Sequence, residues 1–126
     1  GNNAGTQCAV ETTIVDEGGG GEGCTPGYWR NHLEQWAFTG FAPGDSAEAV
    51  FGIDLKGSLD GITLEEAVNL GGGGIRKVLR HGTAGLLSAA HPDVDYPFTV
   101  AEVIAFVQAG DIDAVVEANE AGCPIN

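Results

Sequence analysis

Candidate helix caps constrain the fold of this chain more than any other feature. They are serine and threonine residues that stand directly before segments with apolar residues at helical spacing. The candidate helix caps are Thr25, Ser46, Thr63 and Thr99. Two of them are followed three residues later by a glutamate, Glu66 and Glu102, which is the pattern of a capping box. Thr25 precedes Pro26, which suits the first position of a helix. The chain therefore signals several helix starts at short intervals.

The apolar spacing that follows these caps predicts short helices between residues 25 and 120. The expected segments begin at Thr25 and continue with 47–51, 63–70, 75–90, 99–109 and 111–120, the last capped by Asp111. The helix over 75–90 is the longest and ends at His91-Pro92, because a residue before proline disfavours helical backbone. Its expected apolar stripe contains Ile75, Val78, Leu79, Gly82, Leu86 and Ala90. We predict an all-α fold, a compact bundle of five to six short helices.

The first helix should contribute large side chains to the core. Trp29, His32, Leu33 and Trp36 lie at helical spacing on one face, and we expect them to form part of the structural core. On the longest helix, Ala84, Gly85 and Ser88 form a second face of small residues. Small side chains would allow another backbone to approach this face closely.

The N-terminal residues differ from the rest of the chain. Cys8–Asp16 is rich in β-branched residues and predicts one short strand. Glu17–Gly23 predicts a flexible acidic linker. Because the remainder is helical, this strand has no obvious partner within the chain. We therefore divide the chain into an extended arm with its linker, 1–23, and a helical domain, 24–126, and expect assembly contacts from Val10, Thr12, Ile14 and Val15.

The charge balance restricts the partners of the protein. The chain holds 18 acidic and 5 basic residues, for a net charge of -13. Such a surface repels phosphate backbones and anionic membranes, which argues against nucleic-acid binding. No run reaches the roughly 18 apolar residues of a membrane span. The chain lacks methionine, and we expect a mature protein left after signal peptide removal, located outside the cell or at its surface.

The three cysteines point to an oxidising compartment and leave one thiol over. Cys24 and Cys123 bracket the helical domain, and we favour a disulfide between them. The alternative joins Cys8 to Cys24 across the linker. If Cys24 pairs with Cys123, then Cys8 is either a free thiol or half of a disulfide to a neighbouring subunit.

The segments GCTPGYWRNH, LRHGTAGLLSAAHP and GCP together suggest a relationship. The chain resembles a recurring module of exported bacterial and archaeal proteins, which opens with Cys-Thr-Pro-Gly, then Tyr or Phe, Trp, Lys or Arg, Asn and His. The resemblance covers residues 24–124 and implies export and a helical module, with no activity attached. Gly82 and Gly85 stand where alanines are more usual in that module, which weakens the helix and tightens its packing.

Few residues suggest chemistry. His32, His81 and His91 are the only histidines and could form a zinc, copper or haem site, although no HxxxH or HxH spacing supports one. For His32, a hydrogen-bonded core histidine is the plainer interpretation. His81 lies off the apolar stripe and could face a groove or solvent. His91 could act as a cation at a helix end. Asp93 and Asp95 could bind calcium, but a solvated surface is the simpler interpretation. We expect no cofactor.

The remaining motifs do not indicate catalysis. Gly71–Gly74 precedes Ile75-Arg76-Lys77, but the segment lacks the P-loop pattern and a preceding strand, so we expect a simple loop. No Ser/His/Asp or Cys/His arrangement can be read from the spacing, and we expect a protein that is not an enzyme. Our leading hypothesis is a secreted structural subunit that self-assembles into a filament or surface layer through its arm. The alternative is a small extracellular metal-binding or redox module that uses the three histidines.

Overall fold

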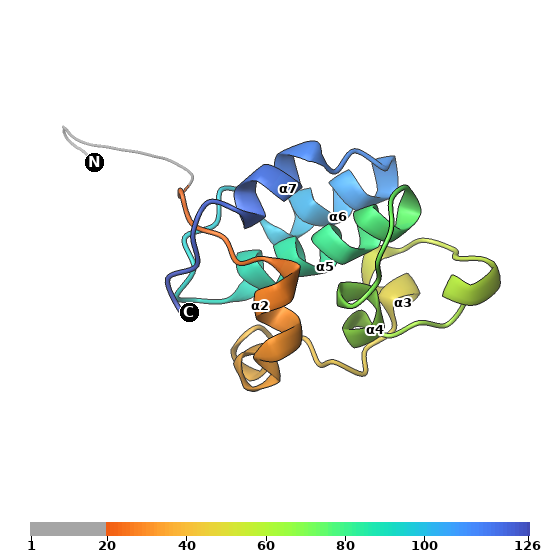
Figure 1. Ribbon diagram of the computed structural model, residues 1–126, viewed down its shortest axis with the longest axis horizontal. Coiled ribbons are helices and arrows are strands. Elements are labelled where there is room, and N and C mark those ends of the chain that lie inside the picture. The colour runs from red at the N-terminus through yellow and green to blue at the C-terminus, as the bar shows by residue number, and fades with distance from the viewer. Residues whose placement is uncertain (1–19) are drawn as a thin grey trace.

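Residues 20–126 are described by a computed structural model, and they fold into a compact set of short helices around one long helix (Figure 1). The elements are α2 (Pro26–Asn31), the 3-10 helix η1 (Leu33–Phe38), α3 (Ala47–Phe51), the 3-10 helix η2 (Gly57–Leu59), α4 (Leu64–Val68), α5 (Ile75–Ala90), α6 (Val100–Ala109) and α7 (Asp113–Asn119). Within these residues β-pairing is limited to two isolated bridges. The predicted all-α bundle is confirmed, while the strand predicted over Cys8–Asp16 lies outside the described residues.

Helix α5 is the centre of the domain. It packs against α6 and α7 on one side and against α2 and α4 on the other (Figure 1). Its residues from Leu79 to Ser88, apart from Arg80, are all buried. A helix that is buried around most of its circumference must be surrounded by partners, and the short helices supply them.

Two glycines allow the neighbouring helices to approach α5. A Cβ atom added at Gly85 would lie 2.8 Å from Tyr96 Oη and 2.8 Å from Val115 Cγ1. One added at Gly82 would overlap Val107 Cγ2 of α6. Glycine weakens a helix by about 1 kcal/mol relative to alanine, and here the missing side chains make room for α6 and α7. The tightened packing expected at these two positions is thus observed.

The predicted caps are mostly correct. The side chains of Thr25, Ser46, Thr63 and Thr99 each accept a backbone N–H bond in the first turn of a helix, and the two threonine–glutamate capping boxes are both complete. The prediction for Asp111 is wrong, because α7 begins after Ile112 without a side-chain cap. The Asp111 backbone N–H instead donates to Phe106 O at 3.0 Å, and Gly110 is left-handed with φ 71°. Asp111 therefore completes the C-terminal motif of α6.

The first helix is shorter than its apolar spacing suggests. Helix α2 ends at Asn31, His32 leaves helical geometry with φ -134°, and η1 follows. This break changes the direction of the side chains: Trp29 and Trp36 are buried, but Leu33 is 40% exposed and His32 is half-buried. The tryptophans are core residues as predicted, whereas the prediction for Leu33 is wrong and that for His32 holds only in part.

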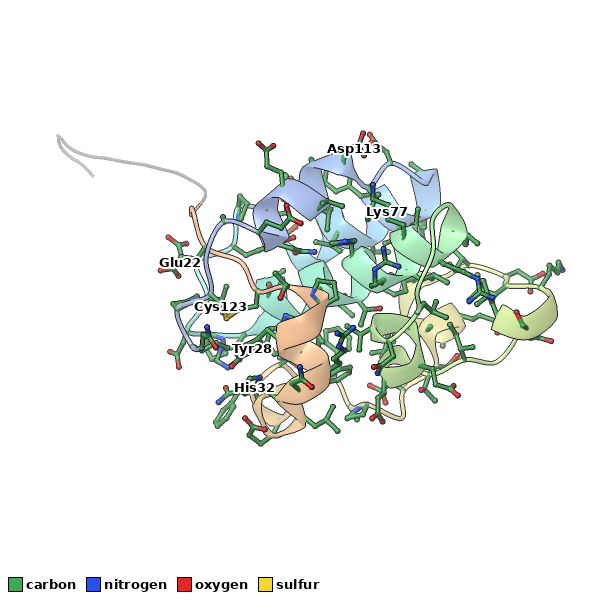
Figure 2. All side chains as sticks on the ribbon, viewed as in Figure 1. Glu22, Tyr28, His32, Lys77, Asp113 and Cys123 are labelled. Carbon is green, nitrogen blue, oxygen red and sulfur yellow. A yellow bond between two sulfur atoms is a disulfide. The ribbon has the colours of Figure 1, made fainter. Side chains whose placement is uncertain are left out.

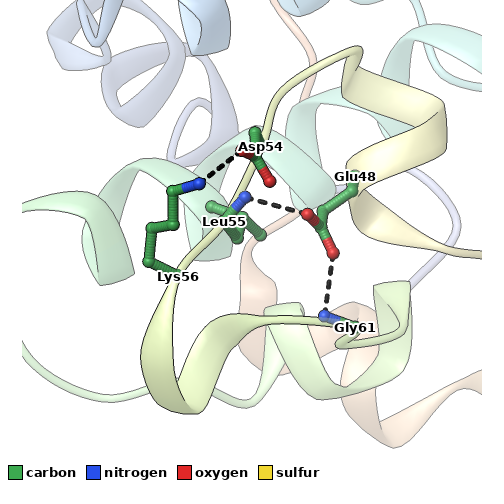
Figure 3. A network of polar contacts seen from close by, with 5 residues as sticks. All are labelled: Glu48, Asp54, Leu55, Lys56 and Gly61. Carbon is green, nitrogen blue, oxygen red and sulfur yellow. Dashed lines mark hydrogen bonds and ion pairs between the residues drawn. The ribbon is translucent and has the colours of Figure 1, made fainter.

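The loop between α3 and α4 is fastened by one carboxylate (Figure 3). Glu48 accepts the backbone N–H of Leu55 at 2.9 Å and that of Gly61 at 2.8 Å. These two hydrogen bonds lower the pKa of Glu48, because they favour its charged form. In the same loop Lys56 forms an exposed ion pair with Asp54. The loop is thereby held against the end of α3.

Candidate functional site at the entrance to the helical domain

Cys24 and Cys123 form a disulfide that closes the domain. Their Cα atoms are 4.6 Å apart, and 99 positions separate them in the sequence. The favoured pairing is confirmed, and Cys24 is not available to Cys8. Cys8 itself lies outside the described residues, as do Val10, Thr12, Ile14 and Val15.

The residues just before Cys24 are also bound to the domain. Glu22 N–H donates to Asp95 O at 3.2 Å, and Asp95 N–H donates to a Glu22 carboxylate oxygen at 2.7 Å. Gly23 N–H donates to Gly122 O at 3.0 Å. Gly23 is buried and lies so close to Ala118 O that a Cβ atom would overlap it. The domain therefore includes Glu22 and Gly23, the last two residues of the predicted linker.

Ser88 of α5 connects this entrance to the centre of the fold. Its Oγ accepts the backbone N–H of Cys24 at 3.1 Å and the indole N–H of Trp29 at 3.2 Å. Ser88 is fully buried, so both bonds are shielded from water. The close backbone approach expected at the small-residue face occurs here. The two donors come from residues more than 50 positions away, and the local sequence around Ser88 gave no signal for them.

Tyr28 and His32 form a stacked pair on α2. Their ring centroids are 4.1 Å apart with an interplanar angle of 11°. Tyr28 Oη donates to Ile125 O at 2.9 Å, which ties α2 to the C-terminal segment. His32 Nδ1 lies 2.9 Å from Tyr28 O and so acts as the donor. Burial, and secondarily the charge of Glu34, raise the pKa of the Tyr28 hydroxyl.

A surface pocket of about 420 Å³ lies between α2 and the C-terminal segment. Its lining includes Thr25, Tyr28, Asn31 and His32 from the opening motif, Gly122 and Cys123 from the closing one, and Glu120 just before the closing motif. Figure 2 shows Tyr28, His32 and Cys123 on this part of the molecule. Two of the three segments quoted above, the opening and the closing motif, thus meet at one pocket. Its amide, hydroxyl and carboxylate groups could hydrogen-bond a small polar molecule.

His81 is buried, which contradicts the prediction that it faces a groove or solvent. The Asn119 side-chain amide donates to His81 O at 3.0 Å and lies 3.3 Å from His81 Nδ1, and Asn119 Oδ1 accepts the Tyr96 hydroxyl at 2.7 Å. Asn119 is on α7, and packing of α7 on α5 covers the imidazole. Burial lowers the pKa of His81, and the charge of Arg80 adds to this effect.

His91 is buried at the end of α5 in its neutral form. Its Nδ1 accepts the Asp93 N–H at 3.1 Å, and its Nε2 lies 2.9 Å from Gln35 Oε1. An acceptor at Nδ1 and a donor at Nε2 describe one neutral tautomer. Burial lowers the pKa of His91, although the charge of Asp93 opposes this. The prediction of a cationic His91 at the helix end is therefore wrong.

The candidate metal ligands do not come together. Among residues 20–126 no group of three or more histidine, cysteine, aspartate or glutamate side chains could hold a metal ion. His32, His81 and His91 have the separate contacts described above, and the Asp95 backbone is bonded to Glu22. Asp93 is exposed. Within residues 20–126 the three histidines are thus not brought together as one set of ligands.

Comparisons with known proteins do not assign the chain to a family. No family model, curated protein or solved structure matches it. The resemblance to the exported module thus remains a prediction from the motifs. In the part of the chain that the structure describes, no helix combines the length and the apolar character of a membrane span.

Proposed function

We propose that the protein is a secreted structural subunit that self-assembles outside the cell through its N-terminal arm. The supporting observation is that the residues of the opening motif make contacts within the domain, beside the point where the arm joins it. Thr25 Oγ1 accepts the Tyr28 N–H, the Asn31 side chain donates to Gly27 O, and the rings of Tyr28, Trp29 and His32 hydrogen-bond or stack within the domain. The most distinctive residues of the chain therefore form the part of the domain that directly follows the arm.

This entrance suits a subunit that is linked to others by its arm. In such an assembly, tension on the arm passes to the domain at Glu22 and Gly23. Both residues hydrogen-bond to distant segments, and the next residue, Cys24, is covalently linked to Cys123. A covalent link directly behind the hydrogen bonds prevents the domain from opening from its N-terminal end.

The sequence of the arm supports contact with another copy. Val10, Thr12, Ile14 and Val15 are residues that favour extended, paired backbone. Residues 20–126 contain no strand that could offer an open sheet edge, so we propose burial of Ile14 and Val15 on a surface of the neighbouring domain. A head-to-tail contact of this kind produces a fibre when it does not close on itself.

The experiment compares two full-length variants with the wild type by negative-stain electron microscopy. Ile14→Asp/Val15→Asp places charges at the proposed contact and should abolish filaments or sheets. Thr12→Ser/Thr13→Ser changes neighbouring arm residues conservatively and should leave them. Both variants should keep the helical circular dichroism of the wild type, because the domain is closed without the arm.

Two results would contradict the proposal. The first is a wild-type protein that stays dispersed at all concentrations under oxidising conditions. The second is normal assembly of Ile14→Asp/Val15→Asp, which would show that these residues make no contact. A Cys8→Ser variant tests separately whether an intersubunit disulfide reinforces the assembly, because its filaments should be unchanged in form and lose any reducible cross-link.

A further inference from the structure

Basic side chains are concentrated in one place on this acidic protein. Arg76, Lys77 and Arg80 are three of the five basic residues, and all three lie in the first two turns of α5. None of them forms an ion pair within residues 20–126, where the salt bridge present joins Lys56 to Asp54. A protein with net charge -13 therefore keeps a cationic cluster without an acidic partner in its described part.

An exposed apolar residue adjoins this cluster. Ile75 is 46% exposed, although its position in the apolar stripe predicted burial. Arg80 is committed to the preceding loop, because it donates to Leu70 O and Gly72 O at 3.0 Å. Arg76 has one hydrogen bond, to Ser58 Oγ at 3.2 Å. Ile75, Arg76 and Lys77 are consecutive residues in the first turn of α5, with Ile75 exposed and the two cationic residues half-exposed. This turn, named here the Ile75–Lys77 surface, offers one apolar and two cationic side chains that spread around the start of the helix.

Taking the assembly function above as the premise, we propose that residues Ile14–Glu17 of a second copy bind the Ile75–Lys77 surface. The segment has the sequence Ile-Val-Asp-Glu. Successive side chains of extended backbone alternate in direction, so Ile14 and Asp16 share one side of the segment and Val15 and Glu17 the other. Each side thus brings one apolar side chain for Ile75 and one carboxylate for Arg76 or Lys77. Burial of the apolar side chains supplies the affinity, and the complementary charges fix the position of the segment.

The sign of the charge favours this surface over the other candidates. Residues 1–21 carry Glu11, Asp16 and Glu17 and no basic residue. The exposed pair Leu33 and Phe38 on η1 is accompanied by exposed Glu34. The pocket beside α2 contains Glu120 in its lining. Like charges would oppose docking of the acidic arm at both places.

The arm leaves the domain at a different place from the Ile75–Lys77 surface, which explains how the contact could repeat. In Figure 2, Glu22, where the chain enters the domain, lies at the left edge, and Lys77 lies to the right of the centre. The arm thus leaves from one region and its proposed binding surface is another. Contacts between two different surfaces are heterologous and add subunits in a row unless the rotation closes a ring.

A pair of charge-matched variants tests the surface. Arg76→Gln/Lys77→Gln and Arg30→Gln/Lys56→Gln remove the same charge from different places. The first should raise the protein concentration needed for filaments about tenfold, since two exposed ion pairs are together worth that factor. The second should change it by less than about twofold. Equal effects of the two variants would overturn the proposed surface.

Charge reversal gives a positive test. Asp16→Lys/Glu17→Lys should assemble poorly, and combining it with Arg76→Glu/Lys77→Glu in the same chain should restore assembly, because the ion pairs are reversed. Failure of the combined variant to assemble better than either parent would count against pairing between these residues. Circular dichroism of each variant shows that the domain is folded.

Mixing two defective proteins separates binding in a second copy from binding within one chain. Ile14→Asp/Val15→Asp keeps the surface, and Arg76→Glu/Lys77→Glu keeps the arm. Sedimentation velocity of the mixture should show a one-to-one complex that grows no further. Two unchanged monomers would overturn the proposal. Absence of wild-type filaments would refute the assembly function and this surface with it, whereas wild-type filaments with unaffected charge variants would refute the surface alone.

Discussion

At the scale of single residues, the two buried histidines make stability depend on pH. His81 is covered by α7, and His91 accepts the Asp93 N–H through Nδ1. Burial lowers the pKa of both from 6.5. Protonation would place charge in a buried site and, at His91, would put a proton against another donor. The folded protein therefore binds fewer protons than the unfolded chain below neutral pH.

We predict that the free energy of unfolding falls as the pH drops below about 6.5, the value in the unfolded chain. The contribution is fully present above that pH and decreases by at most about 1.4 kcal/mol per pH unit for each histidine. Urea unfolding at pH 7.5, 6 and 5 measures it. His91→Asn keeps an acceptor near the Asp93 N–H without titrating, so its slope should be shallower. An identical slope would show that His91 titrates equally in both states.

At the scale of helices, the contact of α5 with α6 and α7 depends on the absence of a side chain at Gly85. We predict that Gly85→Ala destabilises the domain by about 1–3 kcal/mol, although alanine favours helix formation by about 1 kcal/mol. The reason is the 2.8 Å approach of a new Cβ to Tyr96 and Val115. Denaturant unfolding followed by circular dichroism gives the change.

Gly73→Ala is the matched control for this prediction. A Cβ atom at Gly73 meets no atom within 4 Å, so the substitution should be within about 0.5 kcal/mol of the wild type. If Gly85→Ala were as stable as Gly73→Ala, the helices would have separated without cost, and the close packing would not contribute to stability.

At the scale of the whole molecule, the Cys24–Cys123 disulfide connects the two ends of the helical domain. We predict that Cys24→Ser/Cys123→Ser lowers the free energy of unfolding by about 2–5 kcal/mol, because cross-linking a long loop restricts the unfolded chain. Thermal and urea unfolding under oxidising conditions measures the loss. Cys8→Ser should unfold like the wild type, and a similar loss in both variants would show that Cys8 takes part in the stabilising bond.

The local signals in the sequence identified most of the elements but fewer of their contacts. Caps and stops act within one turn, so Thr63, Thr99 and the end of α5 at His91 could be predicted from a few neighbouring residues. Asp111 has the residue type of a cap, but its backbone serves the end of α6. The competing role became visible only with the left-handed Gly110 in place.

The sequence pointed to several residues of the candidate site but did not show how they contact one another. The opening motif can be read from residue types, and the pairing of Cys24 with Cys123 was favoured from their positions, but the alternative of Cys8 with Cys24 was decided only by the structure. The Ser88 hydroxyl that binds Cys24 and Trp29 is 64 and 59 positions away from them. The pocket likewise combines residues from both ends of the domain. Such contacts depend on the order in which the helices pack, which no short segment contains.

The sequence alone determined that this chain forms several short helices and one longer one, because helix starts, helix ends and apolar periodicity are local properties. Only the tertiary structure decided which side chains those helices bury. Leu33 turned outward because the chain leaves helical geometry at His32, and His81 was covered because α7 packs over it. Burial is a property of two surfaces in contact, and the second surface comes from a distant part of the chain.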